Sequence, residues 1–477
     1  MNQHSKIAVV GYGLEGRAMV DYLVKHKYDN ITVCDQNVKM KKKMHEGISV
    51  RLGKDYLEGI NDFDVIFRSP GVDHARPEFT QARVEGKRVT SITEYFLEQC
   101  AGTIVGVTGT KGKGTTSTLI YELLQEHFKG GRKHAYLGGN IGIPAIEFLD
   151  KMNGGAVAVL ELSCFQLGDV TKSPKIAVLL NTTSDHLDYY PDRGAYLRAK
   201  EFILTHQDSD DLAVLNADYP YMKYYLPLVK GGAQMVSVRG KKIENGVRVK
   251  GGGSKAGGGG DGGAIYHVID GKEEKVMNVS DIALVGAHNL ENVCPAIVVA
   301  KYFGVSNKAI VKVVKKFKGL EHRIEFVGSK KGVDYYNDSF STNPQTSMAA
   351  AASFVEPTFL ICGGSDKRLG YGAWARKLLT LENVKGVVLN GGTAMKMKKA
   401  LDAAAKVGGR RGTKVVVVDD LESAFAIARE LAEAAAKNVR ARKGGANKAV
   451  VVMSPAAASF DQFENYKKRG EKFGEMV

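Results

Sequence analysis

Short apolar runs alternate with longer amphipathic segments along almost the whole chain, and this alternation is the feature that most limits its fold. The apolar runs include KIAVV near the start, AVAVLELS in the middle and KAVVVMS near the end. Strand-like runs separated by helix-length segments are typical of parallel sheets with helices on both faces. The sequence therefore predicts an α/β fold.

The length of the chain predicts several domains. Its 477 residues exceed what one hydrophobic core holds, because single cores stop growing at roughly 250–300 residues. The strand-like runs form three groups, and we expect domains at 1–100, 101–319 and 320–477. The first and last are expected to be Rossmann-like, and the middle one a P-loop domain with a mainly parallel sheet. The glycine-rich GGGSKAGGGGDGG at 251–263 predicts a surface insertion.

Composition narrows the class of function. The formal net charge is +15, but the lysine clusters lie in helix-like segments without interleaved aromatic residues, so we expect no nucleic-acid partner. No run approaches the roughly 18–20 consecutive apolar residues of a membrane span. The five cysteines are far apart and form no CxxC, which argues against a disulfide framework. We expect a cytoplasmic protein with no membrane contact.

The first glycine pattern is the GxGxxG of Gly11, Gly13 and Gly16, with Asp35 closing the next strand-like run. Such a turn lets backbone amides meet a diphosphate, while the carboxylate accepts a hydrogen bond from a ribose or sugar hydroxyl. Taken alone, the pattern favours a nicotinamide-dependent dehydrogenase. A plain strand-to-helix turn without ligand is the alternative.

The second glycine pattern is a stronger signal for a nucleotide. GTKGKGT at 109–115 follows the strand-like TIVGVT and precedes the helix-like STLIYELLQEHF. Backbone amides of such a loop wrap phosphate oxygens, a lysine contacts the terminal phosphates and a hydroxyl ligates magnesium. The strict GxxxxGK[ST] pattern fails at Val107 and Gly114, which moves the expected hydroxyl to Thr115.

A third group contains acidic and imidazole side chains. Glu161 ends AVAVLELS, Asp185 and His186 follow KIAVLLNTTS, and Lys200 lies in AYLRAKEF. In doubly wound sheets, ligands collect outside the carboxyl ends of the strands, where Glu161 and His186 are expected. A carboxylate and a neutral imidazole can complete a magnesium shell together with phosphate oxygens and water. Each residue taken singly also fits an ordinary surface position.

Nine segments of the chain resemble the Mur ligase family, in the order in which that family has them. They are GTKGKGT, ELSCFQL, NTTSDHLDYY with AYLRAKEFI, VLNAD, GAHNLENVCPA, HRIEF, YYNDSFSTNPQT, LICGGSDK and MSPAAASFDQFENYKKRG. The resemblance spans nearly the whole chain except the glycine-rich insertion. ELSCFQL and the C-terminal segment are most similar to the glutamate-adding branch of the family.

The resemblance implies a three-domain, ATP-dependent acid–amino-acid ligase of peptidoglycan precursor synthesis. ATP would phosphorylate the carboxylate of UDP-N-acetylmuramoyl-L-alanine, and the amine of glutamate would attack the acyl phosphate. The implied cofactors are ATP, Mg²⁺ at two sites and a carbamylated lysine at Lys200. The enzyme is expected to act on small molecules as a monomer.

The resemblance also implies roles for individual residues. At the nucleotide it implies Gly109, Thr110, Lys111, Gly112, Lys113, Gly114, Thr115, Asn289, Asn292, Arg323 and Asp338. At the metal it implies Thr115, Glu161, His186 and Lys200. Around the UDP sugar and the amino acid it implies Leu14, Glu15, Asp35, Gln36, Ser69, Asn140, Thr342, Lys367, Ser459, Phe460 and Tyr466. The expected catalytic residues are Lys113, Glu161, His186, Lys200, Arg323 and Lys367.

Three positions depart from the family pattern. Gly114 replaces a serine or threonine, Cys164 replaces a serine, and Phe340 stands where many relatives of the glutamate-adding branch have a lysine. The change at Phe340 removes a cation and leaves the amino acid and its D or L configuration open. A sister ligase for another amino acid and a non-catalytic nucleotide-sugar-binding regulator are the remaining alternatives.

Overall fold

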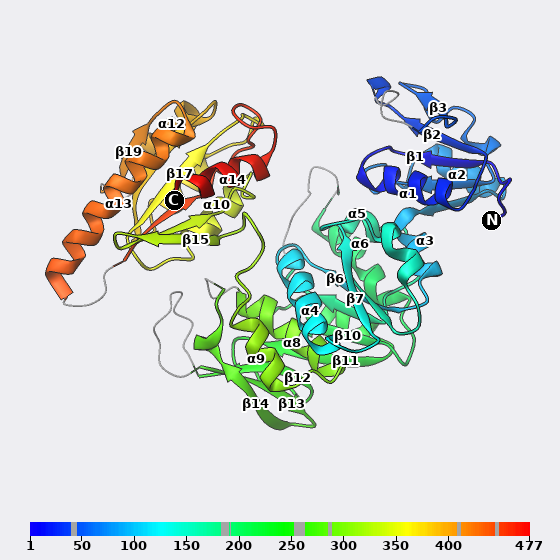
Figure 1. Cartoon of the computed structure of the whole chain (residues 1–477), viewed down its shortest axis with the longest axis horizontal. Coiled ribbons are helices and arrows are strands. Elements are labelled where there is room, and N and C mark those ends of the chain that lie inside the picture. The colour runs from blue at the N-terminus through cyan, green and yellow to red at the C-terminus, as the bar shows by residue number, and fades with distance from the viewer. Residues whose placement is uncertain are drawn as a thin grey trace. The chain divides into compact units, whose positions relative to one another are not determined.

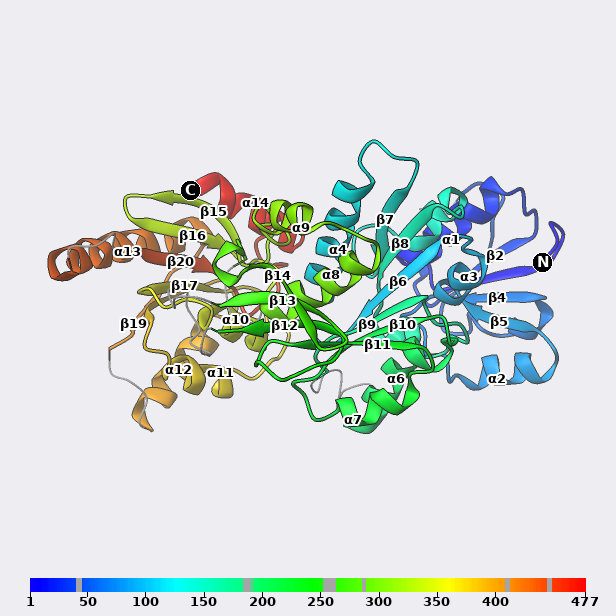
Figure 2. The same cartoon turned by 90° about the horizontal axis from the view of Figure 1, so that it is seen from below.

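The computed structural model describes residues 1–39, 45–182, 190, 192–251, 263–284, 289–407, 412–443 and 448–477, with no side chain described at 438–443. Most of the predicted glycine-rich insertion lies outside these residues, as do Asp185 and His186. The described strands form three sheets (Figures 1 and 2). The α/β class predicted from the alternation of apolar runs is confirmed.

The first sheet has the order β3-β2-β1-β4-β5 among the described strands, and all of its pairings are parallel. Its strands are β1 Ile7–Val10, β2 Ile31–Asp35, β3 Ser49–Leu52, β4 Val65–Arg68 and β5 Arg88–Ser91. Its helices are α1 Leu14–Lys25, the 3-10 helix η2 Ile60–Asp62, α2 Pro77–Val84 and α3 Ile92–Gln99. Figure 2 shows α1 and α3 on one face of the sheet and α2 on the other.

The second sheet has the order β14-β13-β12-β11-β10-β9-β6-β8-β7 among the described strands. The pairings from β7 to β12 are parallel, and β13 runs antiparallel to β12. Its strands are β6 Thr103–Thr108, β7 His134–Gly139, β8 Ala156–Glu161, β9 Ile176–Leu179, β10 Leu212–Asn216, β11 Gly232–Ser237, β12 Gly246–Lys250, β13 Ala264–Ile269 and β14 Lys272–Asn278. Strands β8, β9 and β10 are buried along their whole length, which explains their continuous apolar sequences.

The helices of the second sheet follow its strands in the chain. They are α4 Lys113–Phe128, η3 Ala145–Lys151, α5 Cys164–Leu167, α6 Arg193–Thr205, α7 Met222–Tyr225, η4 Leu226–Leu228, η5 Val279–Asp281, α8 Leu290–Tyr302 and α9 Asn307–Val314. Helix α4 packs against α8, and α5 packs against α6.

The third sheet has the order β15-β16-β20-β17-β18-β19 among the described strands, with β15 antiparallel and the other pairings parallel. Its strands are β15 Glu325–Lys330, β16 Val333–Asn337, β17 Thr358–Gly363, β18 Val384–Asn390, β19 Lys414–Val417 and β20 Ala449–Met453. Its helices are α10 Pro344–Ala351, α11 Gly372–Leu378, α12 Ala394–Lys406, α13 Leu421–Lys443 and α14 Tyr466–Met476. One hydrophobic cluster joins α10, α11 and α12 to the sheet, and a second joins α13 and α14 to it.

The chain divides into two compact units. The first unit comprises Met1–Gly251, Ala264–Met277 and Leu290–Val314 and holds the first and second sheets. The second unit comprises the described residues of Gly252–Gly263, Asn278–Asn289 and Lys315–Val477 and holds the third sheet. The domain boundaries expected at 101 and 320 stay a prediction.

Within the first unit, one hydrophobic cluster is shared by the first and second sheets. Phe96 of α3 meets Phe148 of η3 edge to face, with ring centroids 5.5 Å apart. The shared core indicates that these two sheets are stabilised together. No helix in the described ranges is long and apolar enough to cross a membrane.

Candidate functional site

The glycine-rich loop lies between β6 and α4, at the carboxyl edge of the second sheet. Gly109 has φ +153° and Gly112 has φ +87°, which other residues rarely adopt. A Cβ on Gly112 would lie 2.1 Å from Asn292 Oδ1, so a side chain does not fit there. The loop thus brings backbone close to the start of α4, where unpaired N–H groups favour a phosphate.

Two lysines from different helices meet at this loop. Lys113 Nζ donates to the carbonyl oxygens of Gly109 at 3.1 Å and Thr110 at 3.4 Å. Lys200 Nζ, from α6, donates to the same Gly109 oxygen at 3.2 Å, and its residue is 1% exposed. The structure therefore brings together two of the predicted catalytic lysines, which are far apart in the sequence.

Sequence reasoning missed Tyr196, which lies one helical turn before Lys200 on α6. Its ring centroid is 4.7 Å from Lys200 Nζ, and its hydroxyl is 3.0 Å from Thr110 Oγ1. Tyr196 thus links the buried lysine to the phosphate loop. The i, i+4 spacing in AYLRAKEF was the available signal, since such pairs share a helix face.

Glu161 ends β8 and is 7% exposed. It lies opposite Val107 in the register of β8 with β6, so its strand ends beside the loop. Asn140 donates from Nδ2 to Glu161 Oε1 at 3.0 Å and from its backbone N–H to the Glu161 carbonyl oxygen at 2.8 Å. Two residues assigned separately from sequence, one to the metal and one to the substrate, are therefore in direct contact.

Asn292 and Thr116 connect the loop to helix α8. The Thr116 hydroxyl lies 3.4 Å from the Asn292 carbonyl oxygen and 3.5 Å from its Oδ1. Thr116 is therefore turned toward α8. This orientation supports Thr115, 6% exposed in the first turn of α4, as the hydroxyl for a metal.

The described residues offer few magnesium ligands on their own. Within the described part of the chain, no group of three or more His, Cys, Asp or Glu side chains is arranged to hold a metal. Glu161 and Thr115 fit a Mg²⁺ ion that takes its other ligands from a nucleotide and water, which is how proteins usually hold this ion. The metal role predicted for His186 lies outside the described residues.

A second set of predicted residues lies at the carboxyl edge of the first sheet. Asp35 accepts a hydrogen bond from Tyr12 N at 2.7 Å, and the Ser69 hydroxyl donates to the Gly11 carbonyl oxygen at 2.7 Å. Asp35 is the last residue of β2 and Ser69 follows β4, and these two strands lie on either side of β1. Leu14 and Gln36 are exposed beside them.

Glu15, in the first turn of α1, contacts the second sheet's helices. Its Oε1 accepts a hydrogen bond from Gln166 Nε2 of α5 at 2.7 Å. Burial is the main cause that raises the pKa of Glu15 to about 7, opposed by the hydrogen bond from Gln166 and by Arg68. The carboxyl group therefore changes charge near neutral pH.

Arg68 and Asp169 form a buried ion pair nearby. Arg68 Nη2 lies 2.6 Å from Asp169 Oδ1 and its Nε 3.0 Å from Oδ2, with Arg68 1% exposed. Sequence reasoning missed this pair, because nothing in the sequence marks two residues 101 positions apart as partners. It joins the end of β4 to the segment after α5.

The remaining predicted residues lie in the second unit, around the carboxyl ends of β16, β20 and β17. These strands are neighbours in the third sheet. Thr342 follows β16, Lys367 follows β17, and Ser459, Phe460 and Tyr466 follow β20. Lys367 and Phe460 are exposed, and Ser459 is buried. Asn289 is buried at the start of the segment that leads into α8.

Asp338 directly follows β16 in the same unit. Arg323 lies just before β15, whose first residue pairs with the last residue of β16. Ser454 Oγ donates to Asp338 Oδ2 at 2.6 Å, and burial is the main cause that raises the pKa of Asp338 to about 6. The Arg323 guanidinium lies over the ring of Phe340, 5.3 Å from its centroid. Phe340, where the resemblance led us to expect a lysine, thus faces an arginine, and its ring meets Tyr466 edge to face at 5.2 Å.

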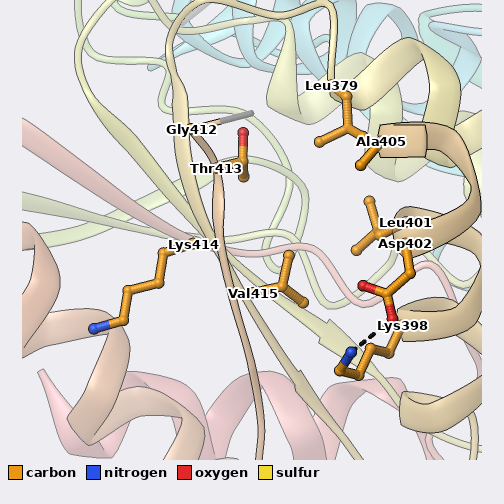
Figure 3. Close-up of a pocket in the computed structure, with 9 residues that line it drawn as sticks. All are labelled: Leu379, Lys398, Leu401, Asp402, Ala405, Gly412, Thr413, Lys414 and Val415. Atoms are coloured by element: carbon orange, nitrogen blue, oxygen red, sulfur yellow. Dashed lines mark hydrogen bonds and ion pairs between the residues drawn. The ribbon is translucent and has the colours of Figure 1, made fainter. Parts of the chain in front are cut away.

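Neither of the two cavities described in the structure contains a predicted site residue. One of about 380 Å³ lies between α12 and β19, and the ion pair of Lys398 and Asp402 on α12 forms part of its lining (Figure 3). The other, about 450 Å³, lies at β3 and is lined by residues between Arg51 and Asp62. The predicted site residues lie instead at the loop and strand ends described above.

Three family models match the chain, and each matched range corresponds to one of the three sheets. Residues 107–300 match the Mur ligase middle domain, 5–91 the MurD-like N-terminal domain, and 322–455 the Mur ligase glutamate ligase domain. Together with the phosphate loop, these matches define an ATP-dependent ligase. The chain belongs to the Mur ligase family.

Curated relatives match over the full length. The UDP-N-acetylmuramoylalanine–D-glutamate ligase of Acetivibrio thermocellus is 36% identical, covering 100% of this chain and 96% of that protein. The ligase of the same name from Symbiobacterium thermophilum is 35% identical, covering 99% and 97%. Both identities extend through all three matched domains.

Solved structures share the fold. The UDP-N-acetylmuramate-alanine ligase MurC of Thermotoga maritima has a TM-score of 0.55 at 17% identity, covering 99% of each chain. MurF of Acinetobacter baumannii has a TM-score of 0.58 at 14% identity, covering 99% of this chain and 92% of that one. The arrangement expected from the resemblance is thus confirmed at the level of the fold.

Proposed function

We propose that this protein adds D-glutamate to UDP-N-acetylmuramoyl-L-alanine in an ATP-dependent reaction of peptidoglycan precursor synthesis. The observation that carries the proposal is the meeting of Lys113 and Lys200 at the Gly109 carbonyl oxygen. It occurs in a chain that resembles, over its full length, ligases with that printed name. Cytoplasmic location, a monomeric state and the domain boundaries at 101 and 320 belong to the same proposal.

The proposed chemistry follows from the weakness of a carboxylate as an acylating agent. Transfer of the ATP terminal phosphoryl group to the alanine carboxylate gives an acyl phosphate. The glutamate amine then attacks the carbonyl carbon, phosphate leaves and an amide remains. Negative charge builds up during both steps, so cations at the loop favour them. Lys113 is the proposed direct contact to the terminal phosphate, and bound Mg²⁺ would add further positive charge.

Lys200 has a different proposed role. Its ammonium group would first lose a proton, and the neutral amine would then attack carbon dioxide with loss of a second proton, so that a carbamate anion forms on the buried nitrogen. That group would give a second Mg²⁺ an oxygen ligand near the loop, in addition to Glu161 and His186. Its burial in contact with Gly109 and Tyr196 supports this role, because the modified group would be held in one place.

The binding roles of the other residues are also part of the proposal. The UDP sugar would contact Leu14, Glu15, Asp35, Gln36 and Ser69, with Asn140 near the alanine end. The incoming glutamate would contact Thr342, Lys367, Ser459, Phe460 and Tyr466. Asn289, Asn292, Arg323 and Asp338 would contribute to nucleotide binding.

The test is a ligation assay with a panel of amino acids in both configurations. Purified protein is mixed with UDP-N-acetylmuramoyl-L-alanine, Mg²⁺ and ATP, and both phosphate release and product mass are measured. D-glutamate is expected to give a product that is heavier by one glutamyl residue. A product with another amino acid would indicate a sister ligase. The panel includes other amino acids because Phe340 stands where the resemblance led us to expect a lysine. ATP binding without turnover under any condition would indicate a regulator instead.

A further inference from the structure

Arg469, on α14, is a buried cation held by neutral groups. It is 4% exposed. Its Nε donates to Ser339 Oγ at 3.0 Å, and its Nη2 donates to the carbonyl oxygens of Ser339 at 3.0 Å and Ala457 at 3.2 Å. Its Nη1 donates to the carbonyl oxygens of Ala457 and Ala458, both at 3.2 Å. The guanidinium group is thus tied to two loops at once.

The charge of Arg469 is not neutralised by direct contact. Among the residues that the structure describes, no carboxylate forms an ion pair with it, and the nearest acidic groups, Asp461 and Asp338, act on it from a distance. Burial lowers the pKa of Arg469 to about 10, so the group stays charged at neutral pH. Burying a charge is costly, and here the hydrogen bonds to the oxygens of Ser339, Ala457 and Ala458 offset part of that cost without cancelling the charge.

The two loops carry three of the residues proposed to contact the incoming amino acid. Thr342 lies three residues after Ser339, and Ser459 and Phe460 directly follow Ala458. The next residue, Gly470, fixes the position of the arginine, since its carbonyl oxygen accepts a hydrogen bond from Asn337 Nδ2 at 3.1 Å. A Cβ on Gly470 would lie 2.3 Å from His322 Nδ1. The start of α14 therefore has little freedom to move away from the loops.

We propose that Arg469 is a positioning residue that holds the loops 339–342 and 457–460 and makes them electropositive, so that the site selects an amino acid with an acidic side chain. The inference rests on the proposed function and deepens it. Phe340 carries no charge, so Arg469 is the cation that these two loops share.

The test compares the kinetics of Arg469→Met, Arg469→Lys and Ser339→Ala with the parent enzyme. Arg469→Met is expected to raise KM for D-glutamate about tenfold or more while changing KM for ATP less than about twofold. It is also expected to reduce the preference for D-glutamate over D-glutamine. Arg469→Lys keeps the charge and is expected to lie in between. Ser339→Ala removes one acceptor and is expected to give a smaller rise of the same kind.

The matched control is Lys467→Met, which removes an exposed positive charge from the same helix and should change neither KM. If Arg469→Met fails to fold, Arg469→Lys and Ser339→Ala still decide the question. Equal changes in both KM values, or an unchanged preference for glutamate over glutamine, would overturn the inference.

Failure of the parent enzyme to use D-glutamate would instead count against the proposed function, and the series would then be run with the amino acid it does use. A parent enzyme that prefers an amino acid with a neutral side chain would also overturn the inference.

Discussion

Lys113 is the residue on which nucleotide use depends most directly. Lys113→Ala is expected to lower kcat/KM for ATP by about 10²–10³-fold, because a charge near the transferred phosphoryl group is lost. The melting temperature should change little, because the Lys113 side chain is only partly buried at the first position of α4. Ligation rates and nucleotide binding measure the effect. Lys129→Ala, an exposed change at the far end of α4, is the control. Unchanged ATP turnover in Lys113→Ala would refute the assignment of the loop.

Lys200 allows a test of the carbamate. Lys200→Ala is expected to reduce ligation strongly and to recover part of it when formate or acetate is added, because a small carboxylate can occupy the space of the lost group. Because Lys200 is 1% exposed, shortening its side chain to alanine leaves a cavity that a small carboxylate can occupy. Rates measured across a series of acid concentrations give the recovery. A fully active Lys200→Ala enzyme would remove the carbamate from the mechanism.

Glu15 gives a prediction for the pH dependence of stability. Its folded pKa of about 7 exceeds the ordinary value of 4.5, so between these values the folded state binds more protons than the unfolded state. Stability from this group therefore falls as pH rises from about 4.5 to 7. Glu15→Gln should be more stable than the parent by roughly 1–2 kcal/mol at pH 8 and by little at pH 5. Urea titrations at the two pH values measure this, and a difference independent of pH would contradict it.

At the scale of elements, the ion pair that joins the end of β4 to the segment after α5 gives a prediction for the free energy of unfolding. Asp169→Asn leaves the buried Arg68 guanidinium without its charged partner and is expected to cost about 3–5 kcal/mol of unfolding free energy. Replacing both residues with apolar ones should cost less than that single change. Denaturant unfolding of the parent, Asp169→Asn and the double variant measures both losses. A double variant that loses at least as much stability as Asp169→Asn would contradict this expectation.

Strands, helices and the phosphate loop were predictable because their signals are local. The burial of β8, β9 and β10 follows from their apolar runs, and Gly109 and Gly112 stand where the backbone needs positive φ. The contacts that arrange the site were not predictable. Asn140 with Glu161 and Arg68 with Asp169 depend on strand order and on how the first two sheets pack, which no short segment encodes. The role of Arg469 could not be predicted for the same reason, because its hydrogen-bond acceptors lie more than ten residues away in the sequence.

At the scale of the whole molecule, three sheets are stabilised in two compact units. The first and second sheets share a hydrophobic cluster and the buried Arg68 ion pair, whereas the third sheet has clusters of its own on both faces. A shared core makes two sheets unfold together, while separate cores permit separate transitions. We therefore expect two calorimetric transitions rather than three.

The variants introduced above identify the two transitions. Asp169→Asn should lower only the transition of the first unit, and Arg469→Met only that of the second, because the hydrogen bonds described above for each residue lie within its own unit. Mg²⁺ with ADP should raise the first transition, since ligands that bind only the folded state stabilise it by mass action. Differential scanning calorimetry of the parent and both variants provides the measurement. A single transition that both variants lower equally would show that the units unfold as one, and a third transition would separate the first sheet from the second.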